Sequence, residues 1–193
     1  MEKIILASGS PRRKELISRF FEIEIKVCDA DETLPKGLTP KDAVMYLAEI
    51  KAKTVADTLK DGFLVIGADT VVCTDGKILG KPKDESDAYS ILSSLSGKTH
   101  SVYTGFCVIR TTDGKTVNGF EETKVTFRNL DDDEIKAYIK TGEPMDKAGA
   151  YGIQGLGGAF ILGITGDYYN TVGLPLCKLL SCLKKDFNKG VLN

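Results

Sequence analysis

The segment that most constrains the fold is Phe63–Thr74, a nearly continuous apolar run of strand length. A strand that is apolar on both sides needs other elements to cover both faces of its sheet. The chain supplies them, because strand-like runs alternate with helical patterns along its length. Some strands are joined by hairpin turns such as Asp75-Gly76, and others are separated by helices. This pattern predicts an α/β fold with a mixed β-sheet flanked by helices.

Capping residues and apolar spacing place the individual elements. Ser10, Thr39, Asp84 and Asp131 each precede a helical pattern and are good N-cap residues. The expected helices start at 11, 40, 85 and 132, the second running to about 59, and a last helix opens at Pro175. The expected strands cover residues 4–7, 22–28, 63–74, 78–79, 99–110, 115–128 and 159–164, with a glycine-rich loop over 149–158.

Length and composition limit the classes of protein to which the chain can belong. A chain of 193 residues suits one domain or a compact two-lobed one, and its net charge of −1 argues against a nucleic-acid binder or a polybasic membrane surface. The five cysteines are odd in number, form no CxxC pair and mostly lie in apolar runs, which is typical of reduced thiols in a cytoplasmic protein. We expect no signal peptide and no membrane-spanning segment. His100 is the single histidine, so any metal must bind carboxylates and phosphates, as magnesium or manganese does.

The turn after the first strand is the first candidate site. Ser8-Gly9-Ser10 leads into a helix whose first turn carries Arg12, Arg13 and Lys14. Cations are unfavourable at a helix N-terminus, where the backbone already carries partial positive charge. A bound phosphate would explain them, because N–H groups and arginine forks both suit phosphate oxygens. A solvated basic turn is the alternative.

Two charged residues lie where apolar ones are expected. On the helix after Pro40, Lys51 falls in the middle of the stripe of Val44, Leu47, Ala48 and Val55. Asp69 interrupts the buried strand, and a buried carboxylate requires a cation, a metal or several donors. Gly67 just before it permits a close approach by another backbone or a ligand. The site hypothesis competes with snorkelling of Lys51 and with a structural ion pair of Asp69 to Lys51 or Arg13.

Three further segments carry weaker signals. Asp31-Glu32-Thr33 offers oxygen ligands for a divalent cation, and Gly80-Lys81-Pro82 adds a cation at a strand end. Residues 146–155 combine flexible backbone with Tyr151 and Gln154, so that the amide of Gln154 can contact the edge of a base. Each segment alone is equally explained as an ordinary turn or loop.

Taken together and in this order, these motifs resemble one family. The segments that carry the resemblance are Ser8–Arg13, Asp31–Thr33, Lys51-Ala52, Gly67–Thr70, Gly80–Pro82, Leu95–Gly97, Asp146–Gly155 and Val172–Leu176. They resemble the Maf family of nucleoside triphosphate pyrophosphatases, also named septum-formation inhibitor-like proteins. The match spans roughly Ile4 to Leu176. Ile50 departs from the pattern, because many members carry an acidic residue there.

The resemblance implies a fold and an activity. The fold would be a single two-lobed domain over residues 1–193, with an elongated sheet and a central nucleotide cleft as in the inosine triphosphatase superfamily. Members are commonly homodimers that need Mg²⁺ or Mn²⁺ and release a nucleoside monophosphate and pyrophosphate. Asp69 would be the catalytic proton acceptor and, with Glu32, a metal ligand. The triphosphate would be bound by Ser8, Arg12, Arg13, Lys51 and Lys81.

The resemblance also implies a substrate class. Arg12, Thr70 and Gln154 match the positions that separate the branches of the family, and these residue types resemble the dTTP/UTP branch. The Gln154 amide can pair with the N3–H and O4 of uracil or thymine, although a rotated amide also suits cytosine. Two alternatives stay open: a nucleotide-binding regulator of septation acting through a partner, and the branch that hydrolyses 7-methyl-GTP. Modified pyrimidine nucleotides are a further possibility within the first reading.

Overall fold

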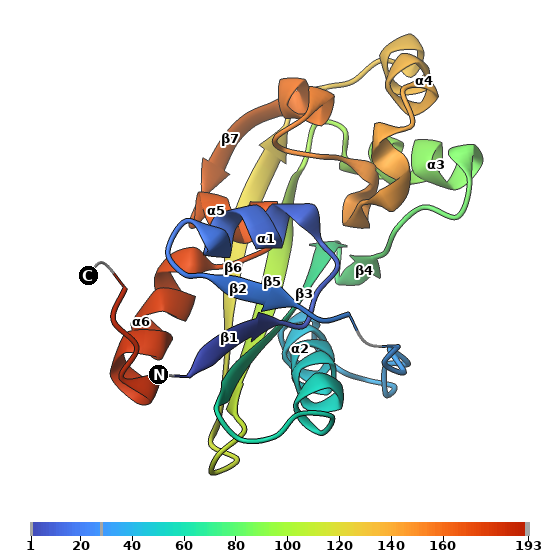
Figure 1. Cartoon of the computed structure of the whole chain (residues 1–193). Helices are drawn as coiled ribbons and strands as arrows, with labels where there is room; N and C mark the ends of the chain where they lie inside the picture. The colour runs from blue at the N-terminus through green and yellow to red at the C-terminus, as the bar shows by residue number, and fades with distance from the viewer. Residues whose placement is uncertain (1, 28, 192–193) are drawn as a thin grey trace. The chain divides into compact units, whose positions relative to one another are not determined.

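The computed structural model describes residues 2–27 and 29–191 and confirms the α/β prediction. Its strands form one sheet in the order β2-β1-β3-β5-β6-β7, with β4 paired to β3 (Figure 1). The strands are β1 Lys3–Leu6, β2 Ile23–Ile25, β3 Phe63–Thr74, β4 Lys77–Leu79, β5 Thr99–Arg110, β6 Thr116–Phe127 and β7 Ile161–Thr165. The α-helices are α1 Pro11–Ser18, α2 Pro40–Ala56, α3 Glu85–Leu95, α4 Asp132–Lys140, α5 Tyr168–Val172 and α6 Leu176–Phe187. Short 3₁₀ helices are η1 Glu143–Asp146, η2 Ala148–Ala150 and η3 Leu156–Phe160.

The sheet is mixed, as predicted. β1 pairs in parallel with both β2 and β3, whereas β4 is antiparallel to β3 and β7 is antiparallel to β6. Parallel neighbours require a helical crossover, and α1 and α2 lie in those connections. The chain divides into two compact units. The first comprises residues up to Asp69, Thr104–Glu121 and the chain from Gly173; the second comprises Thr70–Tyr103 and Glu122–Val172.

The four expected N-caps are present. The side chains of Ser10, Thr39, Asp84 and Asp131 each accept a hydrogen bond from the backbone N–H three residues ahead. Pro11 and Pro40 begin α1 and α2, where the missing proline N–H costs nothing. These local signals explain why the predicted helix starts are correct.

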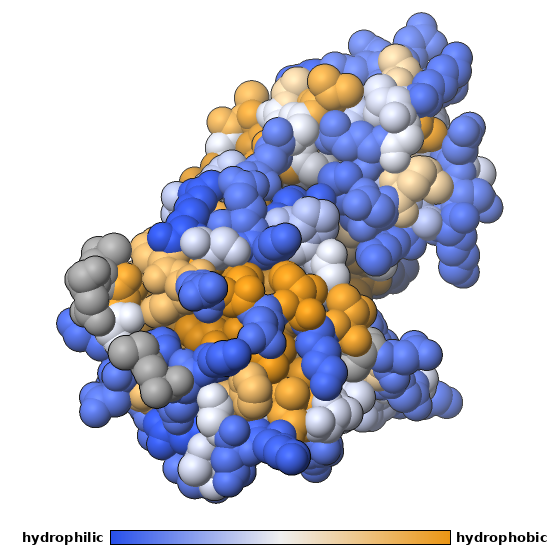
Figure 2. All heavy atoms as spheres, viewed as in Figure 1, coloured by the Kyte–Doolittle hydropathy of each residue, from blue (hydrophilic) through white to orange (hydrophobic). Residues whose placement is uncertain are grey.

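In the first unit, α2 packs against the strands through the predicted stripe. Ala48, Ala52 and Val55 form a buried cluster with β1, β3 and β5, including Ile5 and Val65. Figure 1 shows α2 running alongside β3 in this unit. Figure 2 shows apolar surface in the area where Figure 1 places β1 and β2, and Ile25 of β2 is 40% exposed.

In the second unit, α3 and α4 pack against the parts of β3, β5 and β6 that belong to this unit. Their buried residues join a cluster that includes Phe127 of β6, together with Tyr151 and Phe160 of the glycine-rich segment. His100 lies within this cluster, and its Nε2 is 2.8 Å from the hydroxyl of Tyr151. The segment that carries Gln154 is therefore attached to the core of its own unit.

Three predicted elements begin or end two or more residues away from the observed ones. The helix predicted to run to about residue 59 ends at Ala56, and two strands also differ. The strand predicted over 22–28 is only Ile23–Ile25, because its partner β1 has four residues. Residue 28 of that prediction lies outside the described residues. The strand predicted from residue 159 starts at Ile161, since η3 occupies Leu156–Phe160. In the described part of the chain, no helix has the length and apolar character needed to cross a bilayer.

Candidate active site

The turn between β1 and α1 positions Arg13. The Arg13 side chain donates from Nη1 to Ser8 Oγ at 3.1 Å and from Nε to the carbonyl oxygen of Gly173 at 2.7 Å. Ser8 also accepts the backbone N–H of Ser10 at 3.3 Å, which shapes the turn. Ser8 is buried and Arg13 is partly buried. The structure thus brings Ser8 and Arg13 together, and Arg12 follows the same cap on the first turn of α1.

The Gly173 carbonyl was not predicted as part of this site. The motif Val172–Leu176 enters the sequence analysis only through the family resemblance. A backbone carbonyl carries no side-chain signal, and Gly173 lies 160 residues from Arg13 along the chain. Only the folded chain shows that this motif fixes the guanidinium.

A second group joins Asp69, Lys51 and Glu32. Lys51 Nζ lies 2.6 Å from Asp69 Oδ1 and 3.2 Å from Glu32 Oε1. The Asp69 and Lys51 side chains are only 13% and 14% exposed, whereas Glu32 is 55% exposed and forms the solvent side of the group. The ammonium group of Lys51 therefore does not reach bulk water, and Asp69 pairs with Lys51, one of the two partners expected for it.

Gly67 explains how Lys51 reaches Asp69. A Cβ at Gly67 would lie 2.2 Å from the carbonyl oxygen of Ala48 and 2.7 Å from the N of Ala52. The absent side chain lets α2 lie directly on β3. Gly67 and Asp69 face the same side of the strand, and Lys51 follows Ala48 by about one helical turn. The predicted close approach is thus a backbone approach, and it places the lysine beside the carboxylate.

Electrostatics link Arg13 to the same group. Burial is the main cause that lowers the pKa of Arg13, and the nearby charge of Arg12 lowers it further. The negative charges of Asp69 and Glu32 act in the opposite direction and raise the pKa. The guanidinium nevertheless stays protonated, because arginine begins from a very high pKa. The first unit therefore combines two carboxylates with two cations, Lys51 and Arg13, that are held in place by hydrogen bonds and ion pairs. The cations suit binding of a polyanion, and the carboxylates suit proton transfer.

The loop before α2 presents Glu32. The backbone N–H of Thr33 donates to Asp31 Oδ1 at 3.0 Å. Hydrogen bonds from Thr33 lower the pKa of Asp31, which keeps this turn intact at neutral pH. Glu32 lies between these two residues and reaches Lys51.

The carboxylates of Asp69 and Glu32 are positioned close enough together to suit a hard divalent cation. One oxygen of each carboxylate contacts the same ammonium group, so both lie near a common point. Mg²⁺ is usually held by one or two carboxylates together with water and substrate phosphates. No group of three or more His, Cys, Asp or Glu able to hold a metal occurs among residues 2–27 and 29–191.

The other predicted residues belong to the second unit. Lys81 is exposed just after β4, Gln154 is exposed in the glycine-rich segment, and Thr70 is partly buried in β3. The backbone N–H of Gly149 donates to the carbonyl of Gly80 at 3.0 Å. This bond joins the Lys81 turn to the segment that carries Gln154.

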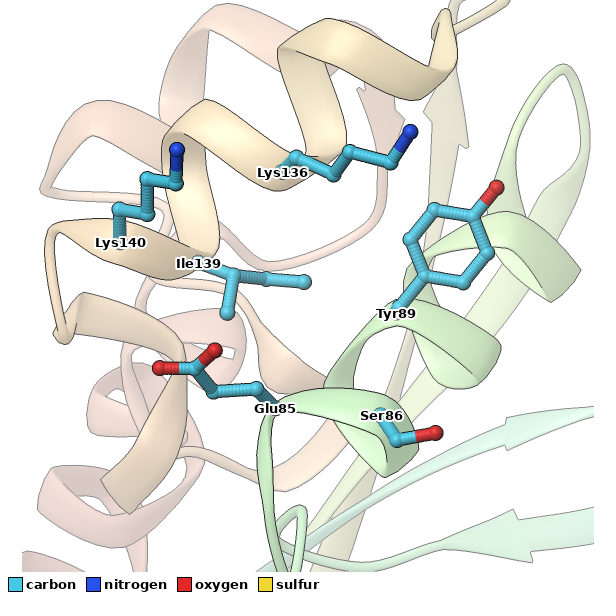
Figure 3. Close-up of a pocket in the computed structure, with 6 residues that line it drawn as sticks. All are labelled: Glu85, Ser86, Tyr89, Lys136, Ile139 and Lys140. Atoms are coloured by element: carbon cyan, nitrogen blue, oxygen red, sulfur yellow. The ribbon is translucent and has the colours of Figure 1, made fainter.

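A separate hollow lies between α3 and α4. It has a volume of about 330 Å³ and is lined by residues of both helices, among them Tyr89 and Lys136 (Figure 3). Tyr89 donates from its hydroxyl to Asp132 at 2.6 Å. None of the predicted site residues lines this hollow.

Comparison with known proteins decides the family. The profile of the family described as "Maf-like protein" matches residues 3–186. The chain belongs to the Maf-like protein family.

Relatives of this Maf-like protein are similar over nearly their whole length. A dTTP/UTP pyrophosphatase of Thermoanaerobacter sp. (strain X514) is 48% identical over 191 residues, which are 98% of this chain and 100% of the relative. A dTTP/UTP pyrophosphatase of Bacillus cytotoxicus is 50% identical over 191 residues, 98% of each chain. Among solved structures, a dITP/XTP pyrophosphatase of Mycobacterium abscessus is similar with a TM-score of 0.42 at 15% identity, covering 66% of this chain and 75% of the other.

Proposed function

We propose that this Maf-like protein hydrolyses dTTP and UTP to the nucleoside monophosphate and pyrophosphate. The observation that carries the chemistry is the Asp69 carboxylate, 13% exposed and 2.6 Å from Lys51 Nζ, in a unit that also holds Arg13 by two hydrogen bonds. The substrate class follows from relatives of that name that are about half identical over nearly the whole chain.

Asp69 is assigned the role of general base. Its carboxylate accepts a proton from the water that attacks the α-phosphorus. The bond from that phosphorus to its bridging oxygen breaks, and the electron pair leaves with pyrophosphate. Lys51 keeps the carboxylate oriented and supplies positive charge as negative charge develops on the phosphate oxygens.

The arginines are assigned to the triphosphate. Arg13 enters the reaction already oriented by Ser8 and Gly173, so little side-chain freedom is lost on binding. Its partner Arg12 can bind phosphate oxygens with a planar fork, whereas Lys81 acts as a point charge. Ser8 contributes here by holding Arg13.

A divalent cation, Mg²⁺ or Mn²⁺, is part of the proposal. Asp69 and Glu32 are the carboxylates that would hold it, together with phosphate oxygens of the substrate. When bound, such a cation neutralises the triphosphate and polarises the attacked phosphorus. Glu32 suits this role because it is the exposed member of the pair.

Base recognition is assigned to Gln154, with Arg12 and Thr70 as the further positions that set the substrate branch. The glutamine amide offers N–H donors beside a carbonyl acceptor, and one donor and the acceptor can pair with the O4 and N3–H of uracil or thymine. Because the two bases differ by one methyl group, dTTP and UTP should differ little as substrates. A homodimer and a cytoplasmic location complete the proposal.

A substrate panel tests this function. The purified protein is incubated with Mg²⁺ or Mn²⁺ and dTTP, UTP, CTP, GTP, ATP or 7-methyl-GTP, and the products are resolved. We expect monophosphate and pyrophosphate from dTTP and UTP. Preferred turnover of 7-methyl-GTP would place the chain in the other branch, and tight nucleotide binding without turnover would favour a regulator.

A further inference from the structure

Glu143 is a charged residue that the proposed mechanism does not use. It opens η1 directly after Gly142, at the point where the chain leaves α4. Its carboxylate accepts three hydrogen bonds: Tyr138 Oη at 2.8 Å, the N–H of Leu156 at 2.9 Å and the N–H of Gly157 at 3.1 Å. Two of these donors follow Gln154 by two and three residues.

The chain around Gln154 passes very close to this carboxylate. We call residues 147–158 the Gln154 loop. A Cβ at Gly155 would lie 2.4 Å from Glu143 Oε1, and a Cβ at Gly152 would lie 3.1 Å from the same oxygen. Gln154 is therefore flanked by glycines whose missing side chains leave room for Glu143.

The start of the loop is attached to the same residue. Lys147 donates from Nζ to the carbonyl oxygen of Glu143 at 2.6 Å, and it also pairs with Asp146 at 2.6 Å. The backbone carbonyl of Glu143 thus binds the part of the loop that precedes Gln154, and the Glu143 carboxylate binds the part that follows it.

The three donors favour the ionised form of the Glu143 carboxylate. Burial opposes ionisation of Glu143, but the hydrogen bonds from Leu156, Gly157 and Tyr138, together with the charge of Lys147, outweigh it and lower the pKa of the group. A carboxylate accepts at both oxygens, whereas an amide accepts at one and donates at the other. A glutamine here would keep the bonds at one oxygen and set its NH₂ against the Leu156 N–H, a donor facing a donor.

We propose that Glu143 is a positioning residue for base recognition: it fixes the backbone on both sides of Gln154 so that the amide is presented in one orientation. This inference rests on the proposed function, because it assumes that Gln154 contacts the base.

The test distinguishes recognition of the base from binding of the triphosphate. For Glu143→Gln we expect the KM for dTTP to rise about tenfold, the fold-change that one lost charged hydrogen bond corresponds to, with kcat changed much less. The inhibition constant of inorganic tripolyphosphate, which has no base, should stay as in the wild type. Tyr138→Phe removes the hydroxyl that donates to Glu143 and accepts the N–H of Gly152, so it should also raise the KM for dTTP and leave the tripolyphosphate constant unchanged.

Matched controls lie in the same unit. Tyr89 and Asp132 form another tyrosine–carboxylate bond, at 2.6 Å, away from the Gln154 loop. Tyr89→Phe and Asp132→Asn should leave the KM for dTTP unchanged. A double-mutant cycle gives the decisive readout, because in a Gln154→Ala background the Glu143→Gln change should add little to KM.

Several results would overturn the inference. Equal KM values for dTTP in the wild type and Glu143→Gln would do so while leaving the proposed function intact. So would an additive effect in the Gln154→Ala background, or an equal rise in the tripolyphosphate constant, because both indicate a general structural effect. A wild type that hydrolyses neither dTTP nor UTP would overturn the proposed function and this inference together.

Discussion

At the scale of single residues, the ion pair of Asp69 with Lys51 is compatible with the proposed role of Asp69 as a base. Lys51 is within 2.6 Å of the carboxylate, which satisfies the charge of Asp69 in the free protein. A purely structural pair and a poised general base therefore have the same geometry in this state. A substitution that removes the Asp69 carboxylate distinguishes the two roles, because only a general base is needed for turnover.

Replacing Asp69 by Asn should reduce kcat for dTTP at least about 100-fold, because an amide cannot accept the proton of the attacking water. The variant should still fold, since Lys51 keeps its contact with Glu32. Steady-state kinetics and circular dichroism measure the two properties. Asp113→Asn, which alters a surface pair with Arg110, is the control. Turnover of Asp69→Asn at the wild-type rate would end its assignment as the base.

His100 makes stability depend on pH. Burial lowers the pKa of His100 from 6.5 to about 4. Between these values the unfolded chain binds a proton that the folded chain does not, so stability is complete above pH 6.5 and falls as the pH approaches 4. The loss from this residue is roughly 3 kcal/mol. Urea unfolding at several pH values should show a steeper decline for the wild type than for His100→Gln, and parallel declines would contradict the assignment.

At the scale of elements, the contact between α2 and β3 depends on one glycine. Gly67→Ala would place a methyl carbon 2.2 Å from the Ala48 carbonyl, and the helix would have to move. Overpacking of this kind costs about 1–3 kcal/mol of stability. Because Lys51 is carried by the same helix, kcat should fall as well.

Thermal unfolding and kinetics of Gly67→Ala measure both effects. Gly163→Ala in β7, where the backbone has no left-handed φ and a Cβ would meet no atom within 4 Å, is the matched control, because it adds a methyl group without a clash. A Gly67→Ala protein with wild-type stability would show that the close approach does not require glycine.

The elements also show what the sequence could predict. Caps such as Ser10 and Thr39 are local signals, and they predicted the starts of α1 and α2 correctly. The pairing of Lys51 with Asp69 was one of several alternatives that the sequence left open, and the structure selects it. β2 was predicted too long, because strand length depends on the partner strand. η3 was missed because the Gly155–Gly158 segment has no side-chain periodicity. Glu143 was missed because two of its three donors are backbone groups more than ten residues away, which leave no side-chain signal in the sequence.

At the scale of the whole molecule, the predicted residues fall in both units. Ser8, Arg13, Glu32, Lys51 and Asp69 are brought together in the first unit by α1, α2 and β3. Lys81 and Gln154 are linked in the second unit by the bond from Gly149 to Gly80. The family resemblance named all of these residues, but only the fold shows which of them lie side by side and which backbone groups hold them.

In the proposed reaction, water attacks the α-phosphorus of a pyrimidine nucleoside triphosphate. The most direct measurement is hydrolysis of dTTP in ¹⁸O-labelled water, with mass spectrometry of both products. Attack at the α-phosphorus places the label in dTMP and leaves pyrophosphate unlabelled. Label in pyrophosphate, or release of dTDP and phosphate, would contradict the account.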